Sequence, residues 1–409
     1  MALPRDIERH LIEYGQETDE PVGLEDLAGE LGLLADEGLD LPWPAGLRPT
    51  PQAWTAANRP DPDDALPQAD VLVVTWTVAE HRALADVLTP GFPAKGWQTY
   101  RRNYASHYIP QIRDGAPALA NNRLGSYFRT KIGDTTLVCF KSELHLNQDG
   151  KETAPGKATL PVKDLFLQLI DEVKPRLVIT VGTAGATFPP RKHTAVGGMD
   201  CPPHQLGDVI ITRAAKFRLQ QEFKNETFAH DTYRCESFAI PQERLAASKP
   251  LLAKFANMLA EPGFGPPHTG YDWPEDQLAP GIANQPDFKI DGRDFPEFHP
   301  ILTTDFFEFG TSHNGLEQIG SGVEMGDAVL GLAIEQLNAA GKPAPDWLVI
   351  RNASDPQINA ALPNRDTPGV PATLRRALDM QAHWAVWYYE TYGYWTSVSS
   401  AIAVWAMAV

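Results

Sequence analysis

Apolar residues recur along this chain with two alternating periods, and the alternation predicts strands separated by helices. Short apolar runs at 70–76, 135–141, 176–182, 207–213 and 347–355 are typical of buried strands. Apolar positions at helical spacing predict helices over 78–88, 162–173, 325–341 and roughly 371–392. Strands that alternate with helices indicate a mostly parallel or mixed sheet covered on both faces.

The N-terminal part of the chain and two internal stretches depart from this alternation. Two short amphipathic helices are predicted over 5–39, and a Pro-rich linker follows up to residue 67. Loop insertions are expected at 189–205 and 261–300, where turn formers are dense and periodicity is weak. We therefore expect one three-layer α/β domain over 68–409, with a mixed central sheet flanked by helices, and a small helical N-terminal appendage over 1–67.

Composition narrows the class of protein. The 409-residue chain carries a net charge of −17, which argues against nucleic-acid binding because that needs a basic face. Its three cysteines are too few and too scattered for a disulfide framework, which favours a cytoplasmic location. The N-terminus lacks the apolar segment of a secretory signal. The longest apolar run, 401–409, is shorter than a membrane span and is expected to end the last helix, so no membrane partner is predicted.

Acidic residues follow two of the predicted strands, where ligands sit in sheets of this kind. Glu80 stands four residues after the first strand, in "TWTVAEH". A carboxylate there is also the ordinary complement of a helix dipole. Asp355 ends the strand "WLVIRNASD" and precedes a proline, so it could equally be a turn residue.

Other candidates are weaker when taken singly. Glu324 precedes a helix and could simply favour its N-terminus, and Asp305 lies beside two phenylalanines that could be core residues. The pair Cys201 and His204 lacks partners at zinc spacing, so no metal is predicted. No nucleotide-binding glycine motif or hydrolase serine motif is present in the sequence.

In their order along the chain, six short segments resemble the nucleoside phosphorylase and nucleosidase superfamily. They are "DVLVVTWTVAEH", "VGTAGAT", "GDVII", "TTDFF", "VEMGDA" and "IRNASD". The resemblance covers roughly 68–395 and is strongest for the hydrolytic branch typified by methylthioadenosine/S-adenosylhomocysteine nucleosidases. It implies that Asp355 donates a proton to a purine base, that Phe307 stacks on the base, and that Glu80 activates water. It also implies that a turn lines the pocket under base and sugar, formed by Thr183, Ala184 and Gly185.

One position separates hydrolysis from phosphorolysis. Phosphorolytic relatives with a similar turn carry an arginine two residues before its first glycine, where it grips phosphate, and this chain has Thr180 there. The resemblance therefore favours a hydrolase, in which the turn floors a nucleoside pocket.

A second position departs from the family pattern. The family has a glutamate directly after the methionine, where it clasps the ribose hydroxyls, but this chain has Gly326 after Met325. Either Glu324 or Asp327 could replace that carboxylate, or the sugar could be held in another way, or the site could have lost turnover. We favour Glu324, because "SGVEM" reads as an extended segment that points residues 324 and 326 to the same face.

The expected function is a cytoplasmic nucleosidase that hydrolyses the N-glycosidic bond of a purine-type nucleoside or nucleotide, without metal or organic cofactor. Its partner is a small-molecule nucleoside or nucleotide, and a homodimer or higher homo-oligomer is expected. Three alternatives stay open. They are a phosphorylase that uses Arg213 or Arg351, a nucleosidase acting on AMP or ATP through basic residues at 100–102 or 191–193, and a catalytically inactive nucleoside-sensing module.

Overall fold

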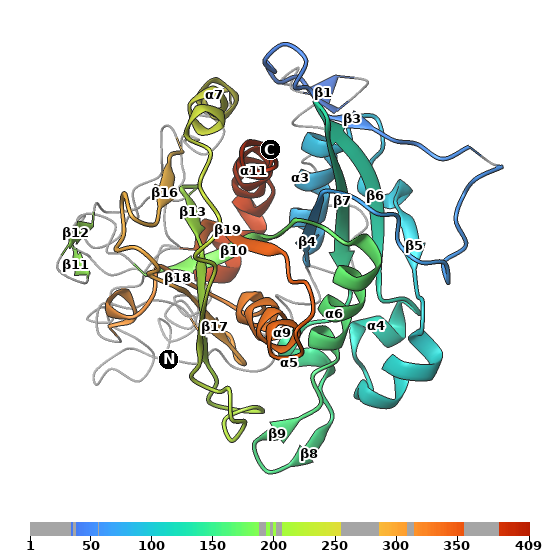
Figure 1. The fold of residues 1–409 in the computed structure, drawn as a ribbon. Coiled ribbons are helices and arrows are strands. Elements are labelled where there is room, and N and C mark those ends of the chain that lie inside the picture. Colours follow the sequence, from blue (N-terminus) through green and yellow to red (C-terminus); the bar gives the residue numbers. More distant parts are fainter. Residues whose placement is uncertain are drawn as a thin grey trace, which may run out of the picture.

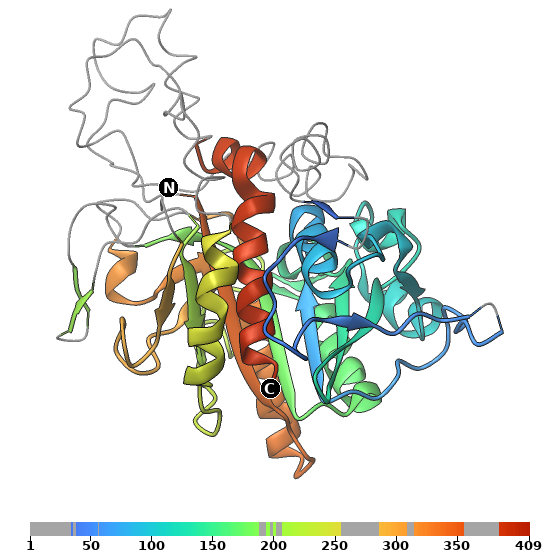
Figure 2. The ribbon, with the colours of Figure 1, turned by 90° about the horizontal axis from the view of Figure 1, so that it is seen from above.

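The computed structural model describes residues 34–35, 38–55, 57–187, 194–196, 199–201, 207–254, 286–308, 315–355 and 384–409. Their ribbon is drawn in Figures 1 and 2. Helices pack on both faces of one large central sheet, as the sequence pattern predicts.

The central sheet has thirteen strands. Its main path runs β15-β14-β17-β18-β10-β4-β7-β6-β3, with β5 on β6, and with β13 linking β19 to β16. The strands are β3 (Thr50–Pro51), β4 (Val71–Thr75), β5 (Gln98–Tyr100), β6 (Gly125–Ile132), β7 (Thr135–Ser142), β10 (Leu177–Ala186), β13 (Val209–Thr212), β14 (Ala214–Arg218), β15 (Thr232–Arg234), β16 (Phe288–Ile290), β17 (Ile301–Thr304), β18 (Gly322–Glu324) and β19 (Asp346–Asp355). Both parallel and antiparallel pairs occur, so the sheet is mixed.

The longer helices form the two outer layers. One layer contains α3 (Val78–Leu88), α7 (Gln242–Ala253) and α11 (Trp384–Met407), and the other contains α6 (Pro161–Val173) and α9 (Asp327–Ala339) (Figures 1 and 2). Short helical turns join the strands at α4 (Pro117–Ala120), α5 (Leu146–Asp149), Ala94–Gly96, Tyr104–Tyr108, Ile109–Gln111 and Leu316–Gln318. Three small hairpins complete the described chain: β1 (Leu34–Ala35) with β2 (Gly38–Leu39), β8 (Glu152–Ala154) with β9 (Lys157–Ala158), and β11 (Thr194–Val196) with β12 (Met199–Cys201).

The buried strands and the helices that cover them agree with the sequence pattern. The predicted strands at 70–76, 135–141, 176–182, 207–213 and 347–355 correspond to β4, β7, β10, β13 and β19. The helices predicted at 78–88, 162–173 and 325–341 correspond to α3, α6 and α9. The residues at 401–409 do end the last helix, but that helix continues well past residue 392, while 371–383 lie outside the described residues.

Three expectations near the appendage and the insertions need correction. Residues 34–39 form the β1–β2 hairpin rather than the end of a helix, and Gly38 in its second strand is a poor helix former. The chain already joins the main sheet at β3, which pairs with β6, ahead of the expected start near Gln68. The predicted 261–300 insertion ends in β16, which pairs with β13 and so belongs to the sheet. Residues 1–33 lie outside the described part.

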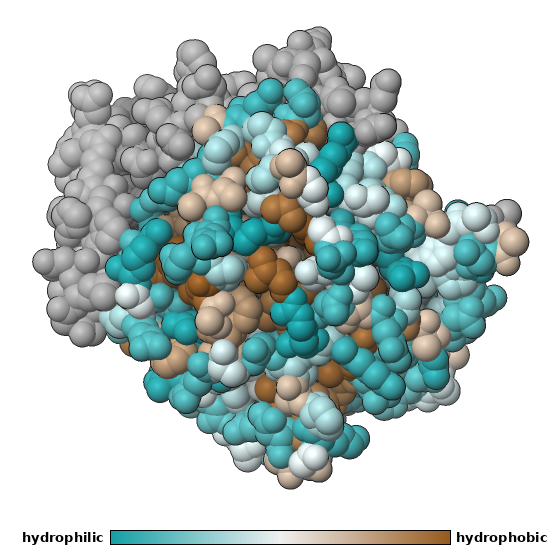
Figure 3. All heavy atoms as spheres, turned by 45° about the horizontal axis from the view of Figure 1, so that its top comes forward, coloured by the Kyte–Doolittle hydropathy of each residue, from teal (hydrophilic) through white to brown (hydrophobic). Residues whose placement is uncertain are grey.

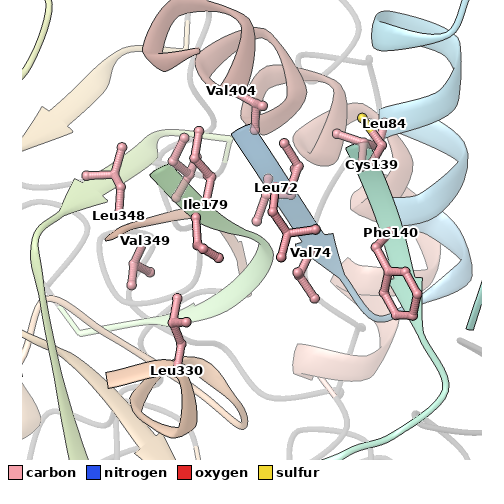
Figure 4. Close-up of a cluster of buried hydrophobic side chains, with 14 of the residues drawn as sticks. Leu72, Val74, Leu84, Cys139, Phe140, Ile179, Leu330, Leu348, Val349 and Val404 are labelled. Atoms are coloured by element: carbon pink, nitrogen blue, oxygen red, sulfur yellow. The ribbon is translucent and has the colours of Figure 1, made fainter. Parts of the chain in front are cut away.

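The core continues across the sheet from one helical layer to the other. Figure 4 shows side chains of β4, β7, β10 and β19 lying between those of α3, α9 and α11, with Leu72, Ile179 and Leu348 among them. All three are fully buried, as are Leu84, Leu330 and Val404 from the helices. Apolar burial of this extent fixes the strand order and thereby the edge of the sheet where the site lies.

The surface seen in Figure 3 is largely hydrophilic, with hydrophobic side chains gathered near the middle of that face. Among the described residues, the large hydrophobic side chains that are exposed are Ile109, Ile319 and Val409. No helix in the described part of the chain is both long and apolar enough to cross a bilayer.

Candidate active site

Three parallel strands bring the predicted site residues to one edge of the sheet. Strand β10 pairs in parallel with β4 on one side and with β19 on the other, so their carboxyl ends lie next to one another. The chain after β4 carries Glu80, residues 182–186 are the last five of β10, and Asp355 is the last of β19. The turn expected at 183–185 is wrong, because these residues continue strand β10 and pair with β19, with a register shift between Ala184 and Gly185. The sequence analysis placed ligand binding at these three segments.

Glu80 lies in the first turn of α3 and is only 4% exposed. It forms a capping box with Thr77, whose hydroxyl accepts a hydrogen bond from the Glu80 N–H. Both carboxylate oxygens accept further bonds: Oε2 from Thr75 Oγ1 (3.0 Å), Trp76 N (3.1 Å) and Thr77 N (2.9 Å), and Oε1 from Thr183 N (2.8 Å) and Thr183 Oγ1 (2.9 Å). Five donors therefore hold this carboxylate in one orientation.

The charge of Glu80 is stabilised despite its burial. Burial by itself would raise the pKa of this carboxyl, but the Arg351 cation and the N–H groups around it lower the pKa below its usual value. Glu80 is therefore an ionised carboxylate inside the protein at neutral pH.

The glycine-containing end of β10 packs against this carboxylate. A Cβ atom at Gly182 would lie 2.5 Å from both Glu80 Oε1 and Arg351 Nη1, so no side chain fits there. The N–H of Thr183 is used by Glu80, and the carbonyl oxygen of Thr183 accepts a bond from Arg351 Nη1 (3.2 Å). The Thr183 N–H is therefore engaged inside the protein, while the Thr183 side chain is half-buried.

Arg351 is the residue that sequence reasoning weighed only as a phosphate ligand. It lies on β19 opposite Gly182 and is 4% exposed. Its guanidinium binds Asp327 in two places, Nε to Oδ2 (2.8 Å) and Nη2 to Oδ1 (2.6 Å), and also pairs with Glu324 Oε2 (3.2 Å). A charged residue inside the apolar run "WLVIRNASD" was the available signal, since a buried cation requires buried carboxylates.

Glu324 and Asp327 meet at this guanidinium from two elements. Glu324 ends the strand β18, which confirms that "SGVEM" is extended, and Asp327 begins α9. Oε1 of Glu324 accepts bonds from Thr303 Oγ1 and Asp327 N (2.9 Å), and Oε2 accepts one from Gly326 N. Burial and the neighbouring Asp327 carboxylate raise the pKa of Glu324 to about 8. Three buried carboxyl groups, including Glu80, thus surround one arginine.

The remaining predicted residues lie on or beside β10, β17, β18 and β19. Asp355 is the last residue of β19 and is the backbone partner of Gly185 across a register shift. Ala184 is buried, and its carbonyl oxygen accepts a bond from Ser354 Oγ (3.4 Å). Phe307 follows β17 and is half-buried. Met325 is also half-buried, and its sulfur accepts a hydrogen bond from the Asn147 amide (3.4 Å).

Asp305, the acidic neighbour of Phe307, has a structural role. Its carboxylate accepts bonds from the N–H groups of Gln220 (2.8 Å), Gln221 (2.9 Å) and Phe223 (3.0 Å). It is 3% exposed, so these bonds replace water around its charge.

The other basic residues considered for phosphate are engaged elsewhere. Arg213 follows β13, which runs antiparallel to β19, so it lies toward the opposite edge of the sheet, where it pairs with Asp291 (3.1 Å). Arg101 pairs with Asp63 (3.0 Å) and Arg102 with Glu172 (3.5 Å). Residues 191–193 lie outside the described residues.

Comparisons with known proteins give similarity to solved structures alone. No family model matches the sequence, and no curated protein matches it. A 5′-methylthioadenosine/S-adenosylhomocysteine nucleosidase from Neisseria meningitidis is 12% identical, with 83% of this chain and 98% of that chain covered and a TM-score of 0.37. The futalosine hydrolase of Helicobacter pylori is 11% identical, with 82% and 96% covered and a TM-score of 0.37. The corresponding nucleosidase from S. pneumoniae is 14% identical, with 83% and 97% covered and a TM-score of 0.38. Values this low say nothing of the substrate of this chain.

Proposed function

We propose that this protein hydrolyses the N-glycosidic bond of a purine-type nucleoside at the carboxyl edge of β4, β10 and β19. The observation that carries the proposal is the cluster of Glu80, Glu324 and Asp327 around Arg351. The cluster lies beside the end of β10, where Gly185 has Asp355 as its backbone partner. The cluster holds more carboxyl groups than cations, and this charge suits a reaction in which the substrate becomes positive.

Glycosidic cleavage has that character. The bond between C1 of the sugar and the base nitrogen breaks, the nitrogen keeps the electron pair, and the sugar gains oxocarbenium charge. Asp355 gives a proton to the base as it departs, which makes the leaving group neutral. Phe307 stacks on the base, and residues 183–185 of β10 line the pocket beneath the base and the sugar.

Water then completes the reaction. Its oxygen forms a bond with C1, and its proton passes to Glu80, which gives up one of its five hydrogen bonds to accept it. A carboxylate with a lowered pKa is a weak base, but attack on an oxocarbenium ion needs little basicity, and orientation contributes most. Glu324 holds the sugar hydroxyls through its carboxyl group. No cofactor takes part in this reaction.

The same geometry disfavours a phosphorylase. A phosphate dianion at this edge would meet three carboxyl groups, and four of the five N–H donors of Arg351 are already used by Asp327, Glu324 and the Thr183 carbonyl. Arg213 lies toward the other edge of the sheet. Hydrolysis therefore remains the better-supported reaction.

The test is base release by an Asp355→Asn variant. The amide keeps the shape of the side chain but cannot donate the proton, so turnover of a purine nucleoside should fall by roughly 10²–10⁴-fold while nucleoside binding persists. Asp346→Asn, at the amino end of the same strand, is the matched control and should leave turnover unchanged. Near-normal turnover in Asp355→Asn would remove Asp355 from the mechanism.

A further inference from the structure

Trp76 is the first residue after β4 and contacts both charged groups of the site. We infer that Trp76 is a positioning residue, which holds the Arg351 guanidinium over its indole ring, and that residue 326 is glycine because the indole limits the space for a side chain there. The effect on turnover rests on the proposed function, whereas the packing claim does not.

The indole is fixed on several sides. The Arg351 guanidinium carbon lies 5.0 Å from the ring centroid, within the range of a cation–π contact. The indole N–H donates to the Leu144 carbonyl oxygen (3.1 Å), and the ring meets Phe166 edge-on at 6.3 Å. Trp76 is 6% exposed, so this contact with Arg351 is largely shielded from water.

Trp76 also touches the second charged group. Its backbone N–H is one of the five donors to Glu80. One residue thus contacts the Glu80 carboxylate through its backbone and the Arg351 cation through its ring. A change in the ring moves Arg351, and Arg351 is the cation that keeps Glu80 ionised.

Gly326 faces the indole from the start of α9. A Cβ atom there would lie 3.2 Å from Cζ2 of Trp76 and 3.5 Å from Cε2 and Cη2, all on the six-membered part of the indole. The φ of Gly326 is −163°, outside the left-handed region, so φ does not require glycine. Space favours glycine, because a Cβ atom at 3.2 Å requires the indole, or the helix start that carries Asp327, to shift by a few tenths of an ångström.

The first readout is structural and independent of activity. The Arg351 Nε–H resonance, assigned by its loss in Arg351→Lys, should be shifted upfield by the ring current of Trp76 in a ¹H–¹⁵N spectrum. Trp76→Leu should abolish that shift, and Trp76→Phe should retain part of it. An unchanged Arg351 resonance in Trp76→Leu would overturn the inference, whether or not any nucleoside is cleaved.

The second readout is a rescue experiment. Gly326→Ala should reduce kcat by roughly three- to thirtyfold with little change in KM, the effect expected from losing a desolvated cation–π contact. The acidic limb of the profile of kcat against pH should shift to higher pH at the same time. The double variant that combines Gly326→Ala with Trp76→Phe should recover most of the lost kcat, because phenylalanine lacks the atoms nearest to residue 326.

Gly96→Ala is the control, because a Cβ atom there meets nothing within 4 Å. If Gly326→Ala matches wild type in both readouts, or if Trp76→Phe fails to rescue it, the packing claim is wrong. If no nucleoside is cleaved by any variant, the proposed function fails, while the resonance of Arg351 still tests the role of Trp76.

Discussion

At the scale of single residues, the site depends on how buried charges are matched. Sequence reasoning identified Glu80, Glu324 and Asp327 because carboxylates beside strand ends and helix starts are visible in the sequence. It did not find that Arg351 joins them, because a single arginine within an apolar strand shows no partner in the sequence. It also missed Trp76, since the contact of an indole with a glycine 250 residues away depends on the tertiary fold.

The roles of Glu324 and Asp327, the two carboxyl groups that could replace the expected sugar ligand, can be separated by mutation. Glu324→Ala should weaken turnover of ribosides by about ten- to a hundredfold, and of 2′-deoxyribosides by less, because a sugar hydroxyl is left without its hydrogen-bond partner. Asp327→Ala instead leaves the buried Arg351 without the carboxylate that binds it at two points. The free energy of unfolding should therefore fall by about 3–5 kcal/mol. The measurements are kcat/KM on paired sugars and urea unfolding. Unchanged riboside kinetics in Glu324→Ala would contradict the assignment.

At the scale of elements, periodicity predicted the strands and helices that line the site, because each has one continuous apolar surface. The short strands were not predicted, since segments such as β3 and β16 are defined by pairing with distant strands rather than by their own pattern. Ion pairs at the ends of strands were not predicted either, and the end of β7 carries one of them. Lys141 there is 3% exposed and pairs with the buried Glu143, which also binds Arg123 (2.7 Å).

This ion cluster at the end of β7 should be essential for stability. Glu143→Ala leaves the Lys141 ammonium buried without its carboxylate, so the free energy of unfolding should fall by about 3–5 kcal/mol. Glu152→Ala on the exposed strand β8 is the control and should change stability by less than about 0.5 kcal/mol. Equal unfolding midpoints for the two variants would show that the cluster does not support the fold.

At the scale of the whole molecule, the described chain is one mixed sheet between two helical layers. Histidines buried in this structure make its stability depend on pH. Burial lowers the pKa of His81 to about 3 and that of His299 to about 4. The Nε2 atoms of both have no hydrogen-bond partner among the described residues, which suits neutral rings. The homo-oligomer expected from the sequence stays a prediction, to be tested by light scattering.

These histidines should destabilise the fold as pH falls. The unfolded chain takes up a proton at each ring below its ordinary pKa of 6.5, whereas the folded chain does not until about pH 3 or 4. Their contribution is therefore complete above pH 6.5 and declines below it, by about 2 kcal/mol for each ring at pH 5. Urea unfolding at pH 7 and pH 5 measures this, and His81→Phe, which keeps the ring contact with Trp97, should reduce the difference. The same difference in wild type and variant would remove His81 from this account.

The central claim is that water, rather than phosphate, takes the sugar at the carboxyl edge of the sheet. The direct measurement is to incubate the full chain with a purine nucleoside in phosphate-free ¹⁸O-labelled water and to analyse the base and sugar by mass spectrometry. We predict release of free base and of a free sugar that carries one ¹⁸O atom at C1. Base release only when phosphate is added, with a sugar 1-phosphate as product, would contradict the account.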